Sequence, residues 1–181
     1  MNREQADRRY FGAFITPIGK LTVIVDGQGV VKDVSFRDPD LTGIFPDDMA
    51  IAPVRTQIEE YFAGQRRVFD LPLGPDGTPF QRAVWDGLLT IPFGQTLSYG
   101  QLAERVGRPG ASRAVGAANG ANPIPIIIPC HRVIGSDRTL TGFGGGVPVK
   151  AALLTLEGVT VRGASDGANR RTRIDAQPSL F

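Results

Sequence analysis

The only cysteine and the only histidine of this 181-residue chain are neighbours, Cys130 and His131. A free thiol is only a few per cent thiolate at neutral pH, so a cysteine nucleophile needs a base, and histidine commonly serves. The alternative is a buried structural cysteine beside an exposed histidine. Adjacent side chains of an extended strand point to opposite faces, so contact within this pair requires a turn or a bridging water. The pair is therefore a candidate reactive thiol, and the spacing does not choose between the two geometries.

Composition limits the other chemistry that the chain can do. One cysteine excludes an internal disulfide, and one cysteine with one histidine excludes a Cys/His zinc site built by this chain alone. We therefore expect no metal and no cofactor. No apolar run approaches the roughly 18 to 20 residues of a membrane span, and residues 1–9 lack the apolar stretch of a signal peptide. The expected location is a reducing cytoplasm.

Charge divides the chain into two parts. Residues 1–77 hold 9 Lys/Arg and 12 Asp/Glu, a net charge of −3, whereas residues 78–161 hold 7 and 4, a net charge of +3. A basic second part can face a polyanion. The sequence thus predicts an N-terminal domain with its linker over 1–77, a second domain over 78–160, and a polar, disordered tail over 161–181.

The first part has the pattern of a β-meander followed by one helix. Apolar residues alternate along three short runs that are separated by glycine-containing turns, and a helical period follows until Gly64. The expected elements are strands over 10–15, 21–25 and 30–36, a loop over 37–52, a helix over 54–63 and a linker over 71–77.

The second part is predicted to be mainly helical. Thr78 before Pro79 is typical of an N-cap and a first helical residue, and Ser98 with Gln101 has the spacing of a capping box. The expected helices run over 79–91, 99–106, 111–119 and 149–156. The two middle helices form a helix-turn-helix pattern across a Gly-Arg-Pro-Gly break. The proline-rich run before Cys130 cannot be helical.

The helix over 111–119 lacks the long polar side chains that usually read the major groove. It offers alanine, serine, glycine and one arginine, Arg113. Small residues let a helix backbone approach a narrow groove, and the alternative is tight packing in the core. Arg113 is then either a solvated side chain or a functional probe. Lys150 and Glu157, at the last helix, would ordinarily be surface charges, and the glycine loop over 142–146 lacks the Lys-Ser/Thr of a phosphate-binding loop.

The segment Ile128-Pro129-Cys130-His131-Arg132-Val133-Ile134 resembles the active-site signature of the O6-alkylguanine-DNA alkyltransferase family. The resemblance covers about residues 78–158, and the N-terminal strands are more weakly similar to the family's first domain. The other matching residues are Phe80-Gln81, Val84-Trp85, Ile91-Pro92-Phe93-Gly94, Ser98-Tyr99, Leu102-Ala103, Arg113-Ala114-Val115-Gly116, Asn122-Pro123, Gly145-Gly146, Lys150, Leu153-Leu154 and Glu157-Gly158. The resemblance implies an α/β two-domain fold: a small ribonuclease-H-like domain of β-meander and helix, then a helical winged helix-turn-helix domain that binds DNA and carries the active site.

The resemblance also implies a reaction. Cys130 would take the alkyl group irreversibly from O6-alkylguanine, and from O4-alkylthymine, in duplex DNA, once per molecule, after the base is flipped out through the minor groove. His131 would accept the thiol proton through a water, and Glu157 would orient the imidazole. Tyr99 would donate to the guanine ring, and Lys150 would assist nearby.

The remaining site residues that the resemblance implies contact DNA or the flipped base. Arg113 would fill the space that the guanine leaves, and Asn122 would also brace the turn before the cysteine segment. The implied DNA-binding residues are Ser112, Arg113, Ala114, Gly116, Asn119 and Asn122. The implied base-pocket residues are Tyr99, Val133, Phe143, Gly144 and Gly145. The expected partner is double-stranded DNA containing O6-alkylguanine, without any membrane, bound by a monomer whose cooperative assembly on DNA stays open.

Two departures from the family pattern bear on this expectation. Phe143 stands where many members carry a tyrosine, which removes a hydroxyl near the leaving oxygen, and Asp137-Arg138 replaces a commoner glycine turn. The main alternative is a non-catalytic sensor of alkylated bases, although relatives of that kind lack the cysteine. A winged-helix transcription regulator would need base-reading side chains, and a Cys–His hydrolase would need an oxyanion-hole segment and a distant histidine.

Overall fold

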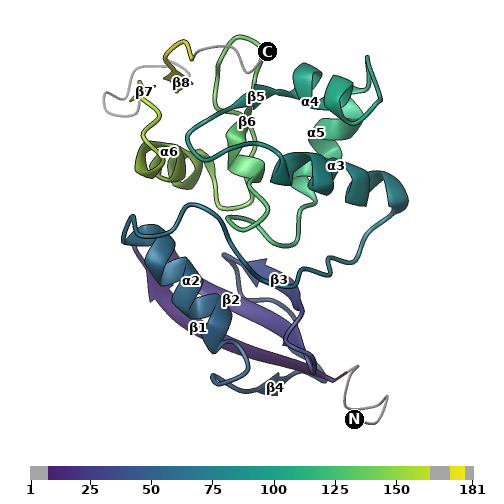
Figure 1. The fold of residues 1–181 in the computed structure, drawn as a ribbon, viewed down its shortest axis with the longest axis vertical. Coiled ribbons are helices and arrows are strands. Elements are labelled where there is room, and N and C mark those ends of the chain that lie inside the picture. The colour runs from purple at the N-terminus through teal and green to yellow at the C-terminus, as the bar shows by residue number, and fades with distance from the viewer. Residues whose placement is uncertain (1–7, 164–171, 178–181) are drawn as a thin grey trace. The chain divides into compact units, whose positions relative to one another are not determined.

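The computed structural model describes residues 8–163 and 172–177. The chain divides into two compact units, and Figure 1 shows the elements of each. The first unit comprises Met1–Asp76 and Pro123–Ile127, and the second comprises Gly77–Asn122 and Ile128–Phe181. Within the described ranges, no helix has the length and apolar character needed to cross a bilayer.

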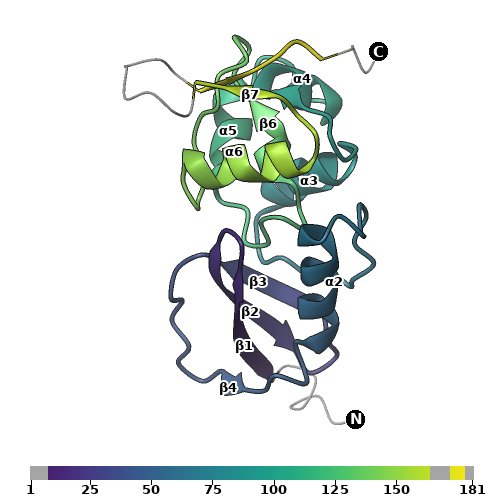
Figure 2. The same ribbon diagram turned by 90° about the vertical axis from the view of Figure 1, so that its left-hand side faces the viewer.

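The first unit is a four-stranded sheet with one helix on a face (Figure 2). Its strands are β1 (Arg9–Thr16), β2 (Gly19–Asp26), β3 (Val31–Ser35) and β4 (Phe45–Pro46), in the order β3-β2-β1-β4. The β1–β2 and β2–β3 pairs are antiparallel, which confirms the predicted meander. Strand β4 lies within the segment that was expected to be loop, and it pairs in parallel with Tyr10 and Phe11 of β1. Two residues are too few to show a strand period, which explains why this strand was not predicted.

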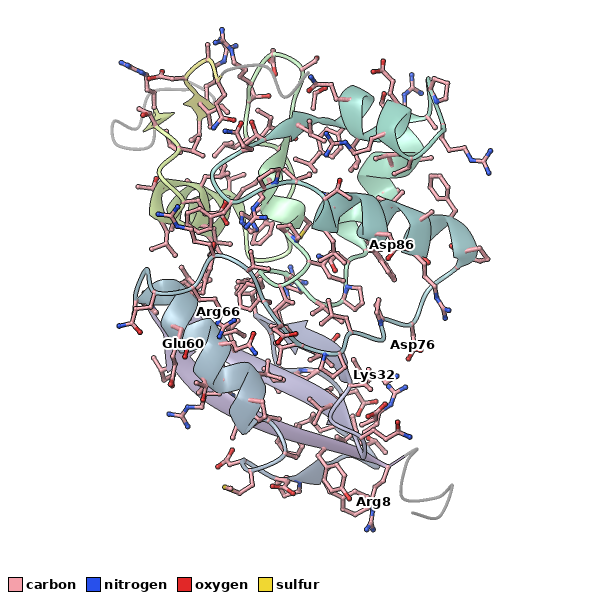
Figure 3. All side chains as sticks on the ribbon, viewed as in Figure 1. Arg8, Lys32, Glu60, Arg66, Asp76 and Asp86 are labelled. Atoms are coloured by element: carbon pink, nitrogen blue, oxygen red, sulfur yellow. The ribbon has the colours of Figure 1, made fainter. Side chains whose placement is uncertain are left out.

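Helix α2 (Ala52–Phe62) buries Val54, Ile58 and Tyr61 as one apolar stripe. These residues recur at helical spacing, so the stripe faces the sheet and the opposite side of the helix meets solvent. The chain leaves the helix at Gly64, which adopts a φ of 72°. It then folds back, so that Arg66 pairs with Glu60 at an Nε to Oε2 distance of 2.7 Å (Figure 3).

The segment that precedes the cysteine packs with the first unit although it lies far along the chain. Pro123 accepts a hydrogen bond from the Val34 backbone N–H at 2.8 Å, and the side chains of Ile124 and Ile126 are fully buried. Ile126 has a φ of 75°, which is strained for a β-branched residue. The predicted second domain over 78–160 is thus interrupted by these residues.

The second unit has a helical core, and both predicted caps are present. Thr78 caps α3 (Pro79–Leu89) and Ser98 caps α4 (Tyr99–Arg105), each in a reciprocal capping box with the glutamine three residues on. Helix α5 (Ser112–Gly120) follows α4, and α6 (Val147–Leu156) comes last. Trp85 of α3 is buried, and its indole N–H donates to the Ala118 carbonyl of α5 at 2.9 Å. This bond and the packing of α3, α4 and α5 fix the platform for the site.

A short parallel sheet joins α4 to the cysteine segment. Strand β5 (Leu97–Ser98) pairs with β6 (Val133–Ile134), so that Leu97 lies opposite Val133. Directly before β6, the residues Cys130–Arg132 form a single 3-10 turn, η1. Adjacent side chains on such a turn do not point to opposite faces as they do in a strand. Contact between Cys130 and His131 requires a turn, and η1 supplies one.

The prediction of a disordered tail over 161–181 is wrong for its described residues. Strand β7 (Val161–Arg162) pairs antiparallel with β8 (Arg173–Ile174), and Ile174 is buried with Leu154 and Val159. One apolar residue in a polar segment gives no periodicity, so the sequence pattern did not reveal this packing. Residues 164–171 and 178–181 of the predicted tail lie outside the described residues.

Candidate active site

Turn η1 buries three consecutive polar or reactive side chains, those of Cys130, His131 and Arg132. The Asn122 side chain hydrogen-bonds the residues on both sides of Pro129. Its side-chain amide donates to the Ile128 carbonyl at 2.8 Å, and the same side chain hydrogen-bonds Cys130. An asparagine side chain offers both donors and an acceptor, so it can hold a bend that no regular element supports.

His131 and Glu157 form a fully buried pair. The Nε2 atom of His131 lies 2.8 Å from Oε1 of Glu157, and both side chains have no exposed surface. The other ring nitrogen, Nδ1, has no hydrogen-bond partner among the described residues. Burial lowers the pKa of His131, although the hydrogen bond and charge of Glu157 oppose this shift. The imidazole is therefore neutral near neutral pH and can accept a proton at Nδ1.

Arg132 holds the same carboxylate from another side. Its Nε and Nη2 atoms donate to Oε2 and Oε1 of Glu157 at 2.9 and 2.8 Å, and its Nη1 atom donates to the Ile91 carbonyl at 2.6 Å. The Gly94 backbone N–H also donates to this carboxylate, 3.0 Å from Oε2. Burial by itself raises the pKa of Glu157, but the hydrogen bonds and charges of His131 and Arg132 outweigh it and lower the pKa to about 2. Glu157 is therefore a fixed anion.

Sequence reasoning assigned no role to Arg132 or Gly94. Arg132 belongs to the matching signature, and its place directly after His131 is the one signal that the sequence offers. Nothing in the spacing of residues 94, 132 and 157 indicates that these three positions meet.

Lys150, which a sequence pattern would place on the surface, is fully buried. Its ammonium donates to the carbonyls of Val133 and Thr141 and so ties β6 to the loop before α6. Burial lowers the pKa of Lys150 to about 8. Burial also raises the pKa of the Cys130 thiol to about 11, whereas the Asn122 hydrogen bond and the Lys150 charge lower it. These two residues therefore oppose the effect of burial on the thiol.

An open cavity of about 580 Å³ lies beside α4 and α5. Tyr99 lines it, and the Tyr99 hydroxyl accepts a 3.4 Å hydrogen bond from the Thr141 hydroxyl. Its lining residues are Tyr99, Gly100, Ser112, Arg113, Gly116, Gly135, Ser136, Asp137, Thr139 and Thr141. Of the predicted base-pocket residues only Tyr99 lines it. Val133 is buried in β6, and Phe143, Gly144 and Gly145 lie on the loop after Thr141.

The predicted DNA-binding residues fall into different environments. Arg113 and Ala114 are exposed on α5, whereas Ser112 and Gly116 are half-buried and line the cavity. Asn119 is 3% exposed, and its amide lies 3.5 Å from the Cys130 carbonyl. The helical period thus turns Asn119 toward the core, and its contact with DNA stays a prediction.

The fold and site define a two-unit protein with a buried cysteine, a neighbouring histidine–carboxylate pair, and an open cavity lined by α4, α5 and the loop over 135–141. A sequence model described as "6-O-methylguanine DNA methyltransferase, DNA binding domain" matches residues 79–159, and another, "6-O-methylguanine DNA methyltransferase, ribonuclease-like domain", matches residues 10–75. The chain belongs to the O6-methylguanine-DNA methyltransferase family.

Individual relatives agree over most of the chain. The methylated-DNA–protein-cysteine methyltransferase of Mycobacterium tuberculosis is 49% identical over 146 residues, 78% of this chain and 88% of the relative. The protein of the same name from Methanosarcina acetivorans is 44% identical over 154 residues, covering 82% and 98% of the two chains. The crystal structure of Mycobacterium tuberculosis OGT in complex with DNA matches with a TM-score of 0.78 and 47% identity, over 82% of this chain and 92% of that chain.

Proposed function

We propose that the protein repairs alkylated DNA by direct reversal, as a methylated-DNA–protein-cysteine methyltransferase. Cys130 takes the alkyl group from O6-alkylguanine in duplex DNA. The observation that carries this proposal is the arrangement of Cys130 and His131 on one buried turn, with the imidazole held by a Glu157 carboxylate that Arg132 and Gly94 fix. The names of the similar proteins support the same activity.

The reaction is a displacement at the alkyl carbon. The thiolate sulfur forms a bond to that carbon while the bond from carbon to guanine O6 breaks, and the electron pair stays with the base. The thiol proton passes through a bridging water to Nδ1 of His131, the ring nitrogen that Glu157 does not engage. Tyr99 supplies a hydrogen bond or proton to the departing guanine, which makes the base a better leaving group. Lys150 favours the thiolate by its charge.

The product is a thioether on Cys130, which has no easy leaving route. Each molecule therefore acts once, and the protein is its own second substrate. O4-alkylthymine is a second substrate by the same chemistry. Phe143 offers a ring that can stack on the base but no hydroxyl near the leaving oxygen.

The target base must leave the stack to reach this site. Helices α4 and α5 act as the helix-turn-helix of a winged helix-turn-helix domain over 78–160, and the small residues of α5 enter the minor groove closely. Arg113, exposed on α5 and lining the cavity, fills the space that the flipped base leaves. Unstacking costs a few kcal/mol and least for a damaged base, which adds selectivity before chemistry begins.

The protein acts as a monomer in the cytoplasm, where Cys130 stays reduced. The net charge of the whole chain is only +2, so we expect modest affinity for DNA and a shallow dependence on salt. Whether neighbouring molecules assemble cooperatively is decided by the shape of the binding isotherm on long duplexes.

The proposed function is tested by measuring the fate of the alkylated base in the DNA. A duplex with one O6-methylguanine is incubated with excess protein, digested to nucleosides and separated by chromatography. Loss of O6-methylguanine with an equal gain of guanine, absent with Cys130→Ser, supports repair. Tight binding of the lesion duplex without loss of the methyl group would instead support the non-catalytic sensor.

A further inference from the structure

The C-terminal segment 172–177 lies against the active-site domain as an added strand. The Leu140 backbone N–H donates to the Thr172 carbonyl at 2.8 Å, and the Ile174 N–H donates to the Arg138 carbonyl at 3.1 Å. Thr139, which bridges to Arg173 between these bonds, also lines the cavity beside Tyr99. The segment thus pairs with residues 138–140 on one side and with β7 on the other.

Gln177, at the end of this segment, reaches the loop that supports Glu157. Its side-chain amide donates to the Gly94 carbonyl at 2.9 Å, and its Oε1 atom accepts from the Thr96 hydroxyl at 2.6 Å. The same Gly94 gives its N–H to the Glu157 carboxylate. One glycine therefore stands between the Gln177 side chain and the carboxylate that holds His131.

Gly94 has little freedom to move without disturbing Glu157. Its φ is 75°, and a Cβ atom on it would lie 2.7 Å from the Glu157 backbone carbonyl oxygen. Interiors packed this closely transmit displacements, because the contacts leave no slack to absorb them. The two groups flank one α-carbon, so a displacement of Gly94 as a whole at its carbonyl side also moves the N–H that donates to Oε2 of Glu157.

We propose that Gln177 is a positioning residue for the alkyl-transfer centre: by holding the carbonyl of Gly94, it fixes the donor that aims the Glu157 carboxylate at His131. The Gln177 side chain is not among the groups that line the cavity beside Tyr99, and it has no hydrogen bond to Cys130 among the described residues. The rate effect of this inference rests on the proposed function, whereas its effect on His131 is independent of any DNA chemistry.

The test uses the full chain with Gln177→Ala, and Arg173→Gln is the control. Arg173 lies on the same segment, is exposed, and has a 3.9 Å ion pair with Asp137 but no contact with Gly94. Because His131 is the only histidine, the imidazole ¹⁵N and N–H resonances of ¹⁵N-labelled protein report one ring without assignment. The imidazole resonances are the first readout. The second readout measures two quantities separately, the Kd for a lesion duplex and the limiting single-turnover transfer rate.

We expect Gln177→Ala to shift the resonance of the N–H that faces Glu157 and to lower the limiting rate about three- to tenfold, the factor of one hydrogen bond, at unchanged Kd. Arg173→Gln should leave both readouts as in the unsubstituted protein. A folded Gln177→Ala protein with unchanged imidazole resonances would overturn the proposal, whatever its transfer rate. Failure of the unsubstituted protein to transfer would count against the proposed function and leave the resonance test decisive for Gln177.

Discussion

Arg132 and Glu157 form a buried, forked ion pair in which the guanidinium donates to both carboxylate oxygens. His131 binds the same carboxylate, so two consecutive residues of the turn η1 contact one anion. The turn η1 allows this convergence, and the two hydrogen bonds from Arg132 hold the Glu157 carboxylate in the orientation that faces the imidazole. The pair therefore links the stability of the domain to the geometry of the proton acceptor.

Removal of the Arg132 side chain is expected to destabilise the protein strongly. Arg132→Met removes both guanidinium donors from the buried Glu157 carboxylate, and breaking such a pair costs about 3 to 5 kcal/mol. The control is Arg162→Met, which breaks the exposed ion pair with Asp175 and should cost far less. Urea unfolding of the three proteins measures the difference. Equal costs for the two substitutions would contradict the buried-pair account.

Stability should fall in two stages as the solution is acidified. Burial lowers the pKa of His131 in the folded state, so below about pH 6.5 the unfolded chain binds a proton that the folded protein excludes. Glu157 has a folded pKa of about 2 against an ordinary value of 4.5. Its contribution is present above pH 4.5 and is lost as the pH falls toward 2, up to about 3 kcal/mol.

The measurement is the free energy of unfolding in urea at intervals from pH 3 to pH 8. The first stage should disappear in His131→Gln, while the fall below pH 4.5 persists. A His131→Gln profile that keeps the full loss between pH 6.5 and 5 would show that another group causes it.

Gly94 and Gly107 offer a matched pair of substitutions. Both have left-handed backbones, with φ values of 75° and 70°, but only at Gly94 would a Cβ meet another atom, the Glu157 carbonyl oxygen at 2.7 Å. Gly107→Ala should cost about 1 to 2 kcal/mol, from backbone strain alone. Gly94→Ala should cost about 1 to 3 kcal/mol more, because the neighbouring backbone must move. Similar thermal unfolding of the two variants would mean that the close approach has no energetic weight.

The sequence predicted those features of the molecule that local patterns encode. The Thr78 and Ser98 caps, the meander, and the break before Cys130 each depend on a few adjacent residues, and each is present. The convergence of Gly94, Arg132 and Glu157 was not predictable, because a loop, the turn η1 and the end of α6, far apart in sequence, produce it. Lys150 shows the same limit, since its burial depends on carbonyl groups from other elements.

Asn122 and Lys150 should both make the thiol more reactive. Each lowers the pKa of Cys130 against the effect of burial, so Asn122→Ala and Lys150→Met should raise it and reduce the thiolate fraction. We expect the rate of modification by iodoacetamide at pH 7, where Lys150 is still mostly charged, to fall about three- to tenfold, since one pKa unit is tenfold in thiolate.

The control for this reactivity series is Lys20→Met, which removes a lysine paired with Asp38 on the first unit. Its modification rate should equal that of the unsubstituted protein. A rate that is unchanged in both Asn122→Ala and Lys150→Met would show that neither side chain acts on the thiol.

The most direct test of the central claim is intact and peptide mass spectrometry after incubation with a duplex that contains one O6-methylguanine. We predict a gain of one methyl group in place of one hydrogen, confined to the peptide that carries Cys130, saturating at one per protein and absent in Cys130→Ser. A protein that binds the lesion duplex and shows no gain in mass, or one that gains the methyl group elsewhere, would contradict the account.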